Sequence, residues 1–194
     1  DSGKVTRAGV PKLQDKDGIE MGNGAICPQY LIDDPEGIYW GKNLPEGIQM
    51  ILDQAPGLKS ICVNYESHPE NGTCDACRTE FARQEKLSAV PTREDIRVGN
   101  PLHLRWRHFR ERQRTKIIAK YYQTMKKHFP QLELWMCTVS LNVGQDPVMA
   151  WSAINPKSFE PYTDVYQNML YCAGKAYFDM LEYNLKELNK PLYP

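Results

Sequence analysis

Apolar residues along this chain follow two periods that alternate. Short apolar runs of the kind found in buried parallel strands are separated by longer stretches in which apolar residues return every three or four positions. We expect strands within residues 25–32, 59–65, 132–141 and 164–171, and the start of a further strand at 191–193. Strands that alternate with helices of about ten residues or more favour a parallel sheet with right-handed crossovers.

The helical period is strongest over residues 102–129, where large apolar and aromatic side chains cluster on one face. Shorter helices are expected over residues 44–56, 74–86 and 174–188, while the polar, glycine-bearing residues 1–21 are interpreted as a loop or a trimmed end. Basic side chains stand between the apolar positions of the long helix, and we interpret them as its solvated face. These side chains are Arg105, Arg107, Arg110, Arg112 and Arg114.

Length and charge narrow the possible classes of protein. A chain of 194 residues with 41% hydrophobic composition can bury a core, and we expect a single domain over residues 1–194. The 24 lysines and arginines balance the 24 aspartates and glutamates, so no basic field favours nucleic acid. No apolar run approaches the roughly 18 residues of a membrane span. We therefore expect neither a nucleic-acid nor a membrane partner, and a neutral ligand fits the balance.

Periodicity alone does not separate a closed barrel from an open, doubly wound sheet. The chain contains neither G-x-G-x-x-G nor G-x-x-x-x-G-K-[ST], the glycine motifs that bind nucleotides in open sheets. In a barrel the chemistry lies where strands end and βα loops begin. Three connections here, 65–68, 142–151 and 171–174, follow expected strand ends and carry polar or aromatic residues. The expected fold class is α/β, with parallel βα units of a TIM-type (β/α)8 barrel, of which this chain would hold part.

One set of motifs resembles a known family. The motifs are Asn64-Tyr65-Glu66 at a strand end, Cys74-Asp75-Ala76-Cys77-Arg78 followed by Phe81, and Trp106 with Phe109-Arg110 on the long helix. Over residues 25–194 they resemble the central part of glycosidase-type barrels related to glycoside hydrolase family 42 and its uncharacterised bacterial relatives. The resemblance implies a hydrolase of O-glycosyl bonds that acts on carbohydrate.

In such barrels a glutamate at the end of the fourth strand, usually in an Asn-Glu pair, is the general acid/base. The resemblance gives this role to Glu66, although Tyr65 is interposed after Asn64. A solvated loop glutamate, or a cap for the helix after Thr73, is the alternative. Glycosidases need two carboxyl groups. Counting strands places the second glutamate beyond residue 194, so the stand-ins within the chain are Asp146 and Asp164.

Other residues near the expected strand ends are candidates for substrate binding, because hydroxyl, amide, carboxylate and aromatic groups suit a sugar. They are Tyr65, His68, Asn142, Asp146, Trp151, Asp164 and Tyr171. Trp135 is interpreted as core packing instead. The alternative function is a non-catalytic barrel module that binds saccharide or packs against other domains of a longer protein.

The six cysteines leave the redox compartment open, and a periplasmic or secreted location is slightly favoured over the cytoplasm. Cys62 and Cys137 stand in apolar strand-like runs, where a thiol is usually inert filler. Cys74-x-x-Cys77 resembles half of a zinc site, and family 42 enzymes can hold structural zinc in this region. Cys27 is a third ligand, but no fourth is evident. We therefore expect no cofactor, one buried and one exposed thiol at Cys74 and Cys77, and structural zinc as the alternative.

Overall fold

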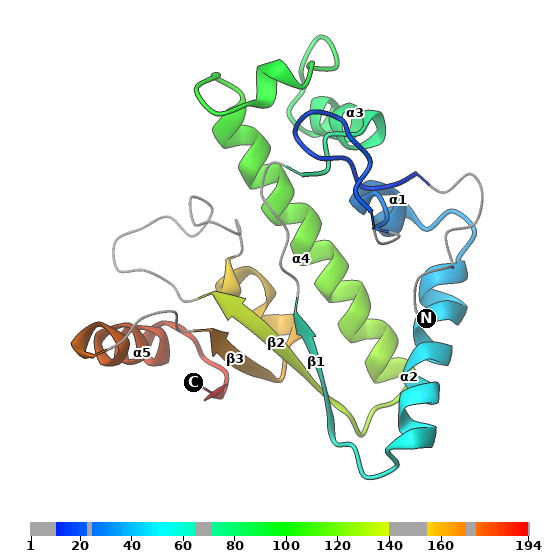
Figure 1. Cartoon of the computed structure of the whole chain (residues 1–194), viewed down its shortest axis with the longest axis vertical. Helices are drawn as coiled ribbons and strands as arrows, with labels where there is room; N and C mark the ends of the chain where they lie inside the picture. Colours follow the sequence, from blue (N-terminus) through cyan, green and yellow to red (C-terminus); the bar gives the residue numbers. More distant parts are fainter. Residues whose placement is uncertain (1–10, 23–24, 65–70, 140–154, 170–173, 194) are drawn as a thin grey trace. The chain divides into compact units, whose positions relative to one another are not determined.

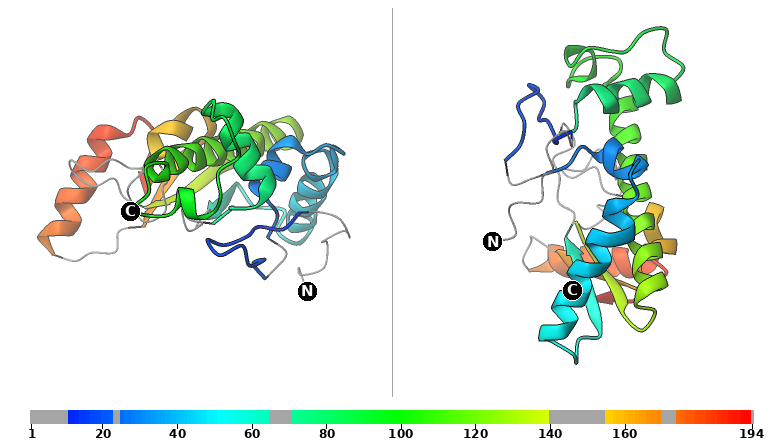
Figure 2. Two further views of the ribbon diagram at one scale, coloured as in Figure 1. Left: turned by 90° about the horizontal axis from the view of Figure 1, so that it is seen from above. Right: turned by 90° about the vertical axis from the view of Figure 1, so that its right-hand side faces the viewer.

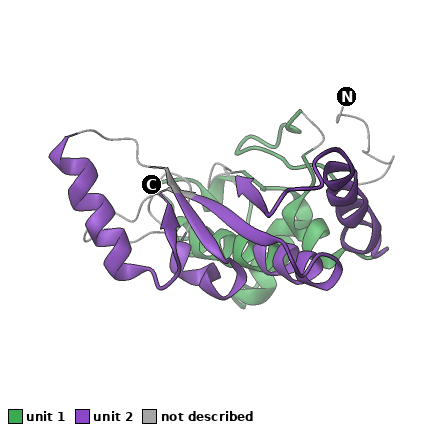
Figure 3. Cartoon of the chain, turned by 90° about the horizontal axis from the view of Figure 1, so that it is seen from below, with its two compact units in different colours: residues 1–35, 67–117 green, residues 36–66, 118–194 purple. Residues whose placement is uncertain are grey.

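The chain divides into two compact units, each made of two separate stretches of sequence. The computed structural model describes residues 11–22, 25–64, 71–139, 155–169 and 174–193. Unit 1 comprises residues 1–35 and 67–117, and unit 2 comprises residues 36–66 and 118–194 (Figure 3). Each unit has its own cluster of buried apolar side chains. The division into two compact units does not test the expectation of a single domain over residues 1–194, which stays a prediction.

Unit 2 is built on a parallel sheet whose strands lie in sequence order. β1 (Ser60–Asn64), β2 (Glu133–Val139), β3 (Val165–Met169) and β4 (Leu192–Tyr193) are hydrogen-bonded in the order β1-β2-β3-β4. Figure 1 shows β1, β2 and β3 side by side. All three pairings are parallel. The strands expected at 59–65, 132–141, 164–171 and 191–193 are thereby confirmed over their described residues. A doubly wound sheet reverses its strand order at a switch point, and the four described strands contain no reversal.

Helices cover one face of this sheet. A π-helical turn (Tyr39–Asn43) leads into α2 (Leu44–Gln54), and η4 (Pro156–Tyr162) and α5 (Lys175–Glu187) flank β3 in sequence. Because side chains alternate across a strand, Leu134, Met136 and Tyr166 point to the same face. They pack there with residues of α2 and of the second half of α4, including Ile48 and Met125. The helices expected at 44–56 and 174–188 are confirmed.

The opposite face of the sheet is open. Cys62 and Gln167 are exposed, Trp135 and Cys137 are half-buried, and Tyr193 is exposed over 55% of its surface. The rings of Trp135 and Tyr193 stack with centroids 4.9 Å apart. The Sγ atoms of Cys62 and Cys137 lie 3.4 Å apart, and the Cys62 thiol donates to Gln167 Oε1 at 3.3 Å. Cys62 lies in an apolar strand as expected, but its thiol is exposed and does not fill a core, because it lies on the open face of the sheet.

Unit 1 contains short helices joined by long connections. They are α1 (Pro28–Asp33), α3 (Asp75–Gln84) and the 3-10 turn η2 (Glu94–Ile96), together with the first half of α4. The strand expected within 25–32 is wrong: Ile26 forms one isolated bridge to Lys12, and a helix begins at Pro28. Proline suits a first helical turn, because its φ is fixed and the missing N–H would have no partner there.

The long helix α4 (His103–His128) is continuous, as expected from 102–129 (Figure 2). Its residues up to Ile117 belong to unit 1 and the rest to unit 2. The interpretation of its arginines as a solvated face is wrong for three of them. Arg107, Arg110 and Arg114 are buried, whereas the side chains of Arg105 and Arg112 are exposed and pair with Glu85. Positions three, four and seven apart share one side of a helix, so Trp106, Arg110 and Gln113 face inward together.

Candidate metal centre

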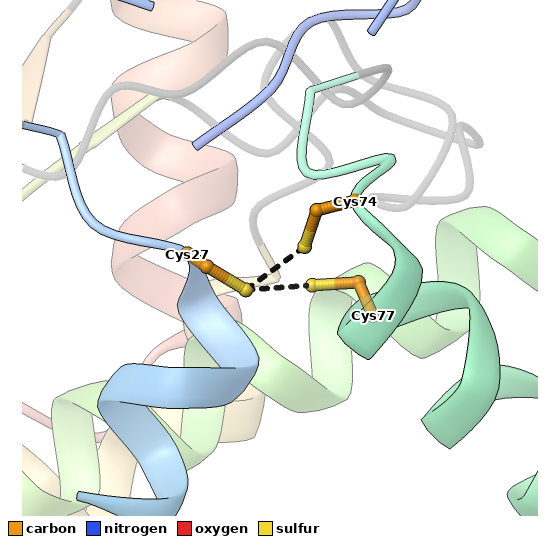
Figure 4. A group of neighbouring side chains, drawn as sticks. All are labelled: Cys27, Cys74 and Cys77. Carbon is orange, nitrogen blue, oxygen red and sulfur yellow. Dashed lines mark hydrogen bonds between the residues drawn. The ribbon is translucent and has the colours of Figure 1, made fainter. Parts of the chain in front are cut away.

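Three cysteines from distant parts of the sequence meet in unit 1. Cys27 immediately precedes α1, Cys74 immediately precedes α3, and Cys77 lies in the first turn of α3 (Figure 4). All three side chains are buried. The Sγ atom of Cys27 is 2.9 Å from that of Cys74 and 3.5 Å from that of Cys77, and the three sulfurs lie within 4.8 Å of one another. The expectation that Cys74 or Cys77 is exposed is therefore wrong.

The spacing of the sulfurs fits a tetrahedral metal ion. A zinc–sulfur bond of about 2.3 Å at tetrahedral angles separates two sulfurs by about 3.8 Å. The observed separations, from 2.9 Å to at most 4.8 Å, span that value. Within the part of the chain that the structure describes, no histidine, aspartate, glutamate or further cysteine joins the group. These residues can supply three thiolates, which is one ligand fewer than a closed zinc site uses.

The surroundings of Cys77 favour a thiolate. Hydrogen bonds from the thiols of Cys27 and Cys74, together with the positive charge of Arg110, hold the pKa of Cys77 well below its usual range against the effect of burial. The first turn of α3 adds the positive end of a helix dipole at Cys74 and Cys77. The hydrogen bond with Cys74 raises the pKa of Cys27. Without a metal, the cluster thus keeps protons on part of its sulfurs.

A second layer of polar side chains from α4 contacts the cysteines. Gln113 Nε2 lies 3.7 Å from Cys77 Sγ and donates to Gln29 Oε1 at 2.9 Å. Arg110 Nη1 donates in turn to Gln113 Oε1. The guanidinium of Arg110 is fully buried against Gly72, where a Cβ atom would lie 2.7 Å from Cζ. Gly72 also has a φ of 87°, a backbone conformation that residues with a side chain rarely adopt.

An aromatic cluster completes the surroundings. The ring centroids of Phe81, Trp106 and Phe109 lie 5.1 to 5.4 Å apart, and all three side chains are buried in the same cluster as the cysteines. Packing of this kind excludes water and lowers the local dielectric. Electrostatic interactions of the sulfurs with Arg110 are correspondingly stronger than at the surface.

Most residues predicted for a carbohydrate site lie outside the described residues. They are Tyr65, Glu66, His68, Asn142, Asp146, Trp151 and Tyr171. Their roles stay predictions. In sequence they fall in the segments that follow β1, β2 and β3 directly. The carboxyl ends of parallel strands share one edge of a sheet, so these segments start from the same edge.

Asp164 is the predicted site residue that the structure describes, and it precedes β3 at the amino edge of the sheet. Its Oδ2 accepts the backbone N–H of Leu134 at 2.8 Å and pairs with Lys126 Nζ at 2.7 Å, while the Tyr122 hydroxyl donates to Oδ1 at 3.3 Å. Burial raises the pKa of Asp164, but Lys126 and the Leu134 N–H outweigh it and lower the pKa overall. These partners join α4 to β2. A role for Asp164 in substrate binding stays a prediction.

A cleft of about 300 Å³ lies in unit 2 between α2, β1 and α4. Apolar side chains such as Ile48, Ile61 and Met125 form most of its lining, and Tyr39 and Tyr121 are hydrogen-bonded to each other at its wall. None of the described residues that line it is a carboxylate. The cleft lies on the helix-covered face of the sheet.

Arg110 and Gln113 are residues of the centre that the sequence reasoning missed. The signal that could have found them is helical position, because they stand four and seven residues after Trp106, on the same stripe as Ile117. The charge of the arginines in α4 predicts a solvated face, whereas their position in the helix decides their burial.

Comparison with known proteins gives little further information. No family model and no curated protein matches the sequence. A solved structure with detectable similarity is a chitinase from Chromobacterium violaceum, which is 13% identical and superposes with a TM-score of 0.38. The similarity covers 93% of this chain and 56% of the chitinase, so the chain spans about half the length of that protein. Among the described helices, none combines the length and apolarity needed to cross a membrane.

Proposed function

We propose that this chain contributes parallel βα units to a TIM-type (β/α)8 barrel that acts on or binds carbohydrate. The observation that supports the proposal is a parallel sheet in sequence order with helices on one face and an open opposite face. Parallel sheets are otherwise covered on both faces. In a barrel the inner face is filled by side chains of the other strands. Trp135, Cys137 and Gln167 would then belong to the barrel interior.

Glu66 is the proposed general acid/base. It is the second residue after the last residue of β1, Asn64, and barrel enzymes carry their catalytic groups at the carboxyl ends of strands. Its carboxyl group would protonate the oxygen of the leaving sugar as the glycosidic bond breaks, and in a retaining reaction it would then take a proton from the attacking water. Retaining chemistry needs a second carboxylate about 5 Å away, and inverting chemistry needs one about 6.5–9.5 Å away. The strand-terminal residues Asn64, Val139 and Met169 supply none.

The test is hydrolysis of a panel of aryl glycosides by the purified chain and by Glu66→Gln. General acid–base catalysis contributes about 10²–10⁴-fold, so Glu66→Gln is expected to lose that much in kcat on substrates with poor leaving groups. Substrates with good leaving groups need less protonation and should lose less. Glu70→Gln, which removes the same charge four residues later, is the matched control. Equal loss in both variants would contradict the role of Glu66.

A non-catalytic saccharide-binding or structural module is the second candidate. The last residues of β1, β2 and β3 are not carboxylates, which favours this interpretation over a complete hydrolytic site. It predicts that oligosaccharides bind with the same affinity to the wild type and to Glu66→Gln, and that neither hydrolyses them. Titration calorimetry with the same sugars as the hydrolysis panel separates the two candidates.

We also propose that Cys27, Cys74 and Cys77 hold one structural zinc ion. Three buried sulfurs at metal-compatible spacing support this proposal. The ion would tie the start of α1 to the start of α3, two points 47 residues apart in sequence. A buried site of this kind stabilises the fold. Elemental analysis should find one zinc per chain, with loss in Cys74→Ser and retention in Cys62→Ser. A wild-type chain that takes up no added zinc would refute the proposal.

A further inference from the structure

The burial of Arg110 requires an explanation that hydrogen bonding does not provide. Its side chain has no exposed surface, and its Nε and Nη2 atoms have no hydrogen-bond partner among the described residues. The bond from Nη1 goes to an uncharged amide, Gln113 Oε1. A buried charge without an opposite charge is strongly unfavourable. A negative charge close to Arg110 would remove this cost.

The cysteine cluster is the group that can supply that charge. Cys77 is linked to Arg110 through Gln113, whose amide contacts Cys77 Sγ with its nitrogen and Arg110 Nη1 with its oxygen. Within the described residues, no acidic side chain forms a salt bridge with Arg110. Arg105 and Arg112 lie on the exposed side of the same helix and form salt bridges with Glu85.

The charges of a loaded centre balance. Three thiolates carry three negative charges, and a divalent zinc ion carries two positive ones, which leaves a single negative charge on the complex. The guanidinium of Arg110 then makes the buried group neutral. With a fourth thiolate or a carboxylate as ligand, the complex and Arg110 together would carry a net charge of minus one. That charge would be buried among Phe81, Trp106 and Phe109. Without metal, the thiolate favoured at Cys77 is the charge within the cluster that can offset Arg110.

We propose that Arg110 is the buried counter-charge of a zinc–tris(thiolate) centre whose fourth ligand is uncharged. The inference rests on the proposed zinc site and adds the charge state of the complex and the residue that sets it. Arg110 is a positioning residue that acts through Gln113 on Cys77 and touches no substrate. Gly72 leaves the space that the guanidinium occupies. The fourth position belongs to a neutral donor such as water, an imidazole or an amide oxygen.

The deciding variant is Arg110→Met, which keeps an apolar stem of similar length and removes the charge. Residues surrounding metal ligands typically change metal affinity by about 10–100-fold when replaced. Zinc affinity, measured by competition with a chelator, should fall by that factor. The metal-free variant should unfold at the same urea concentration as the metal-free wild type or at a higher one, because a buried charge and its desolvation cost have been removed. Arg110→Lys should restore most of the zinc affinity.

These opposite signs separate the proposal from a structural role. An arginine that merely packs would lower the stability of the metal-free chain when replaced and leave zinc affinity unchanged, and that result overturns the inference. Failure of Arg110→Met to fold with and without zinc overturns it as well. Arg105→Met, an exposed arginine on the same helix, is the control and should bind zinc as the wild type does.

X-ray absorption of the zinc-loaded chain tests the ligand set. Three sulfurs and one nitrogen or oxygen are expected, whereas four sulfurs would overturn the assignment of a neutral fourth ligand. A wild-type chain that binds no zinc refutes the zinc site and this inference together. A wild-type chain and an Arg110→Met variant that bind zinc equally well refute only the role of Arg110.

Discussion

The two units of this protein have different kinds of core. Unit 2 has a continuous apolar core, in which one face of a parallel sheet packs against helices through residues such as Leu134, Met136 and Tyr166. Unit 1 has short helices, long connections and an apolar cluster that includes three cysteines. It also buries Arg107, Arg110 and Arg114.

The difference shows where each unit obtains its stability. Apolar burial contributes about 25 cal/mol for each Å² removed from water, and unit 2 draws on the packing of whole strands and helices. Small cores with few regular elements usually need a cross-link, which a metal or disulfides can supply. Unit 1 is of that kind, and the Cys27–Cys74–Cys77 group stands where such a cross-link would join its two shorter helices.

Removal of metal should affect the two units most unequally. Structural zinc contributes roughly 10–16 kcal/mol in small zinc-finger peptides, which exceeds the contribution of any one side chain. With chelator and reductant, amides of α1 and α3 should exchange hydrogen rapidly, while those of β1, β2 and β3 keep their protection. Hydrogen exchange read by mass spectrometry measures this, with chelator omitted as the control. Equal loss of protection in both units would remove the proposed contrast.

Truncation of the sheet core should act on unit 2 alone. Leu134 is buried on the packed face of β2, and replacing a buried leucine by alanine costs about 2–5 kcal/mol. Leu134→Ala should lower the free energy of unfolding by that amount and leave the zinc content unchanged. Gln167→Ala on the open face is the control, with an effect within about 0.5 kcal/mol, as for surface substitutions. Urea denaturation measures both, and a loss of zinc in Leu134→Ala would show that the units are coupled.

The smallest effect is expected at Asp164, and it should depend on pH. The pKa of Asp164 is lowered in the folded chain, because Lys126 and the Leu134 N–H outweigh burial. Its stabilisation is therefore present above the unfolded pKa of about 3.9 and is lost as pH falls through the folded value. Asp164→Asn should cost about 1.5–3 kcal/mol at pH 7, the range for losing hydrogen bonds to a charged group.

The cost of Asp164→Asn should shrink toward zero in acid, below both pKa values. Asp179→Asn, which breaks the exposed pair with Lys175 on α5, should cost less than about 1 kcal/mol at neutral pH. Urea denaturation at neutral and acidic pH compares the two variants. A difference between wild type and Asp164→Asn that grows on acidification would contradict the assigned direction of the pKa shift.

Periodicity predicted most elements of both units, and long-range packing decided what it missed. The apolar runs in 59–65 and 132–141 gave β1 and β2, because a strand buried on one face still needs apolar residues there. The strand predicted within 25–32 is wrong, because Tyr30, Leu31 and Ile32 follow Pro28 and belong to helix α1. Apolar content alone does not distinguish a short strand from a short helix.

The metal centre could be predicted only in part. Cys74 and Cys77 stand three apart at the start of a helix, which places them on one side of its first turn. Cys27 is the third candidate ligand in the sequence, but its contact with the other two depends on packing across 47 residues, which local periodicity does not predict. The burial of Arg110 does not follow from its residue type, because a charged side chain is usually solvated, but its position four residues after Trp106 places it on the buried side of α4.

Because each unit is made of two separate stretches of sequence, neither unit is complete when its first stretch has been synthesised. Unit 1 is interrupted by residues 36–66 of unit 2, and unit 2 is interrupted by residues 67–117 of unit 1. A ribosome therefore completes β1 before Cys74 and Cys77 are synthesised, and β1 has no pairing partner until β2 has been synthesised. Neither unit can be isolated by trimming one end of the chain. A shortened version of either one would have to be rejoined across the excised stretch.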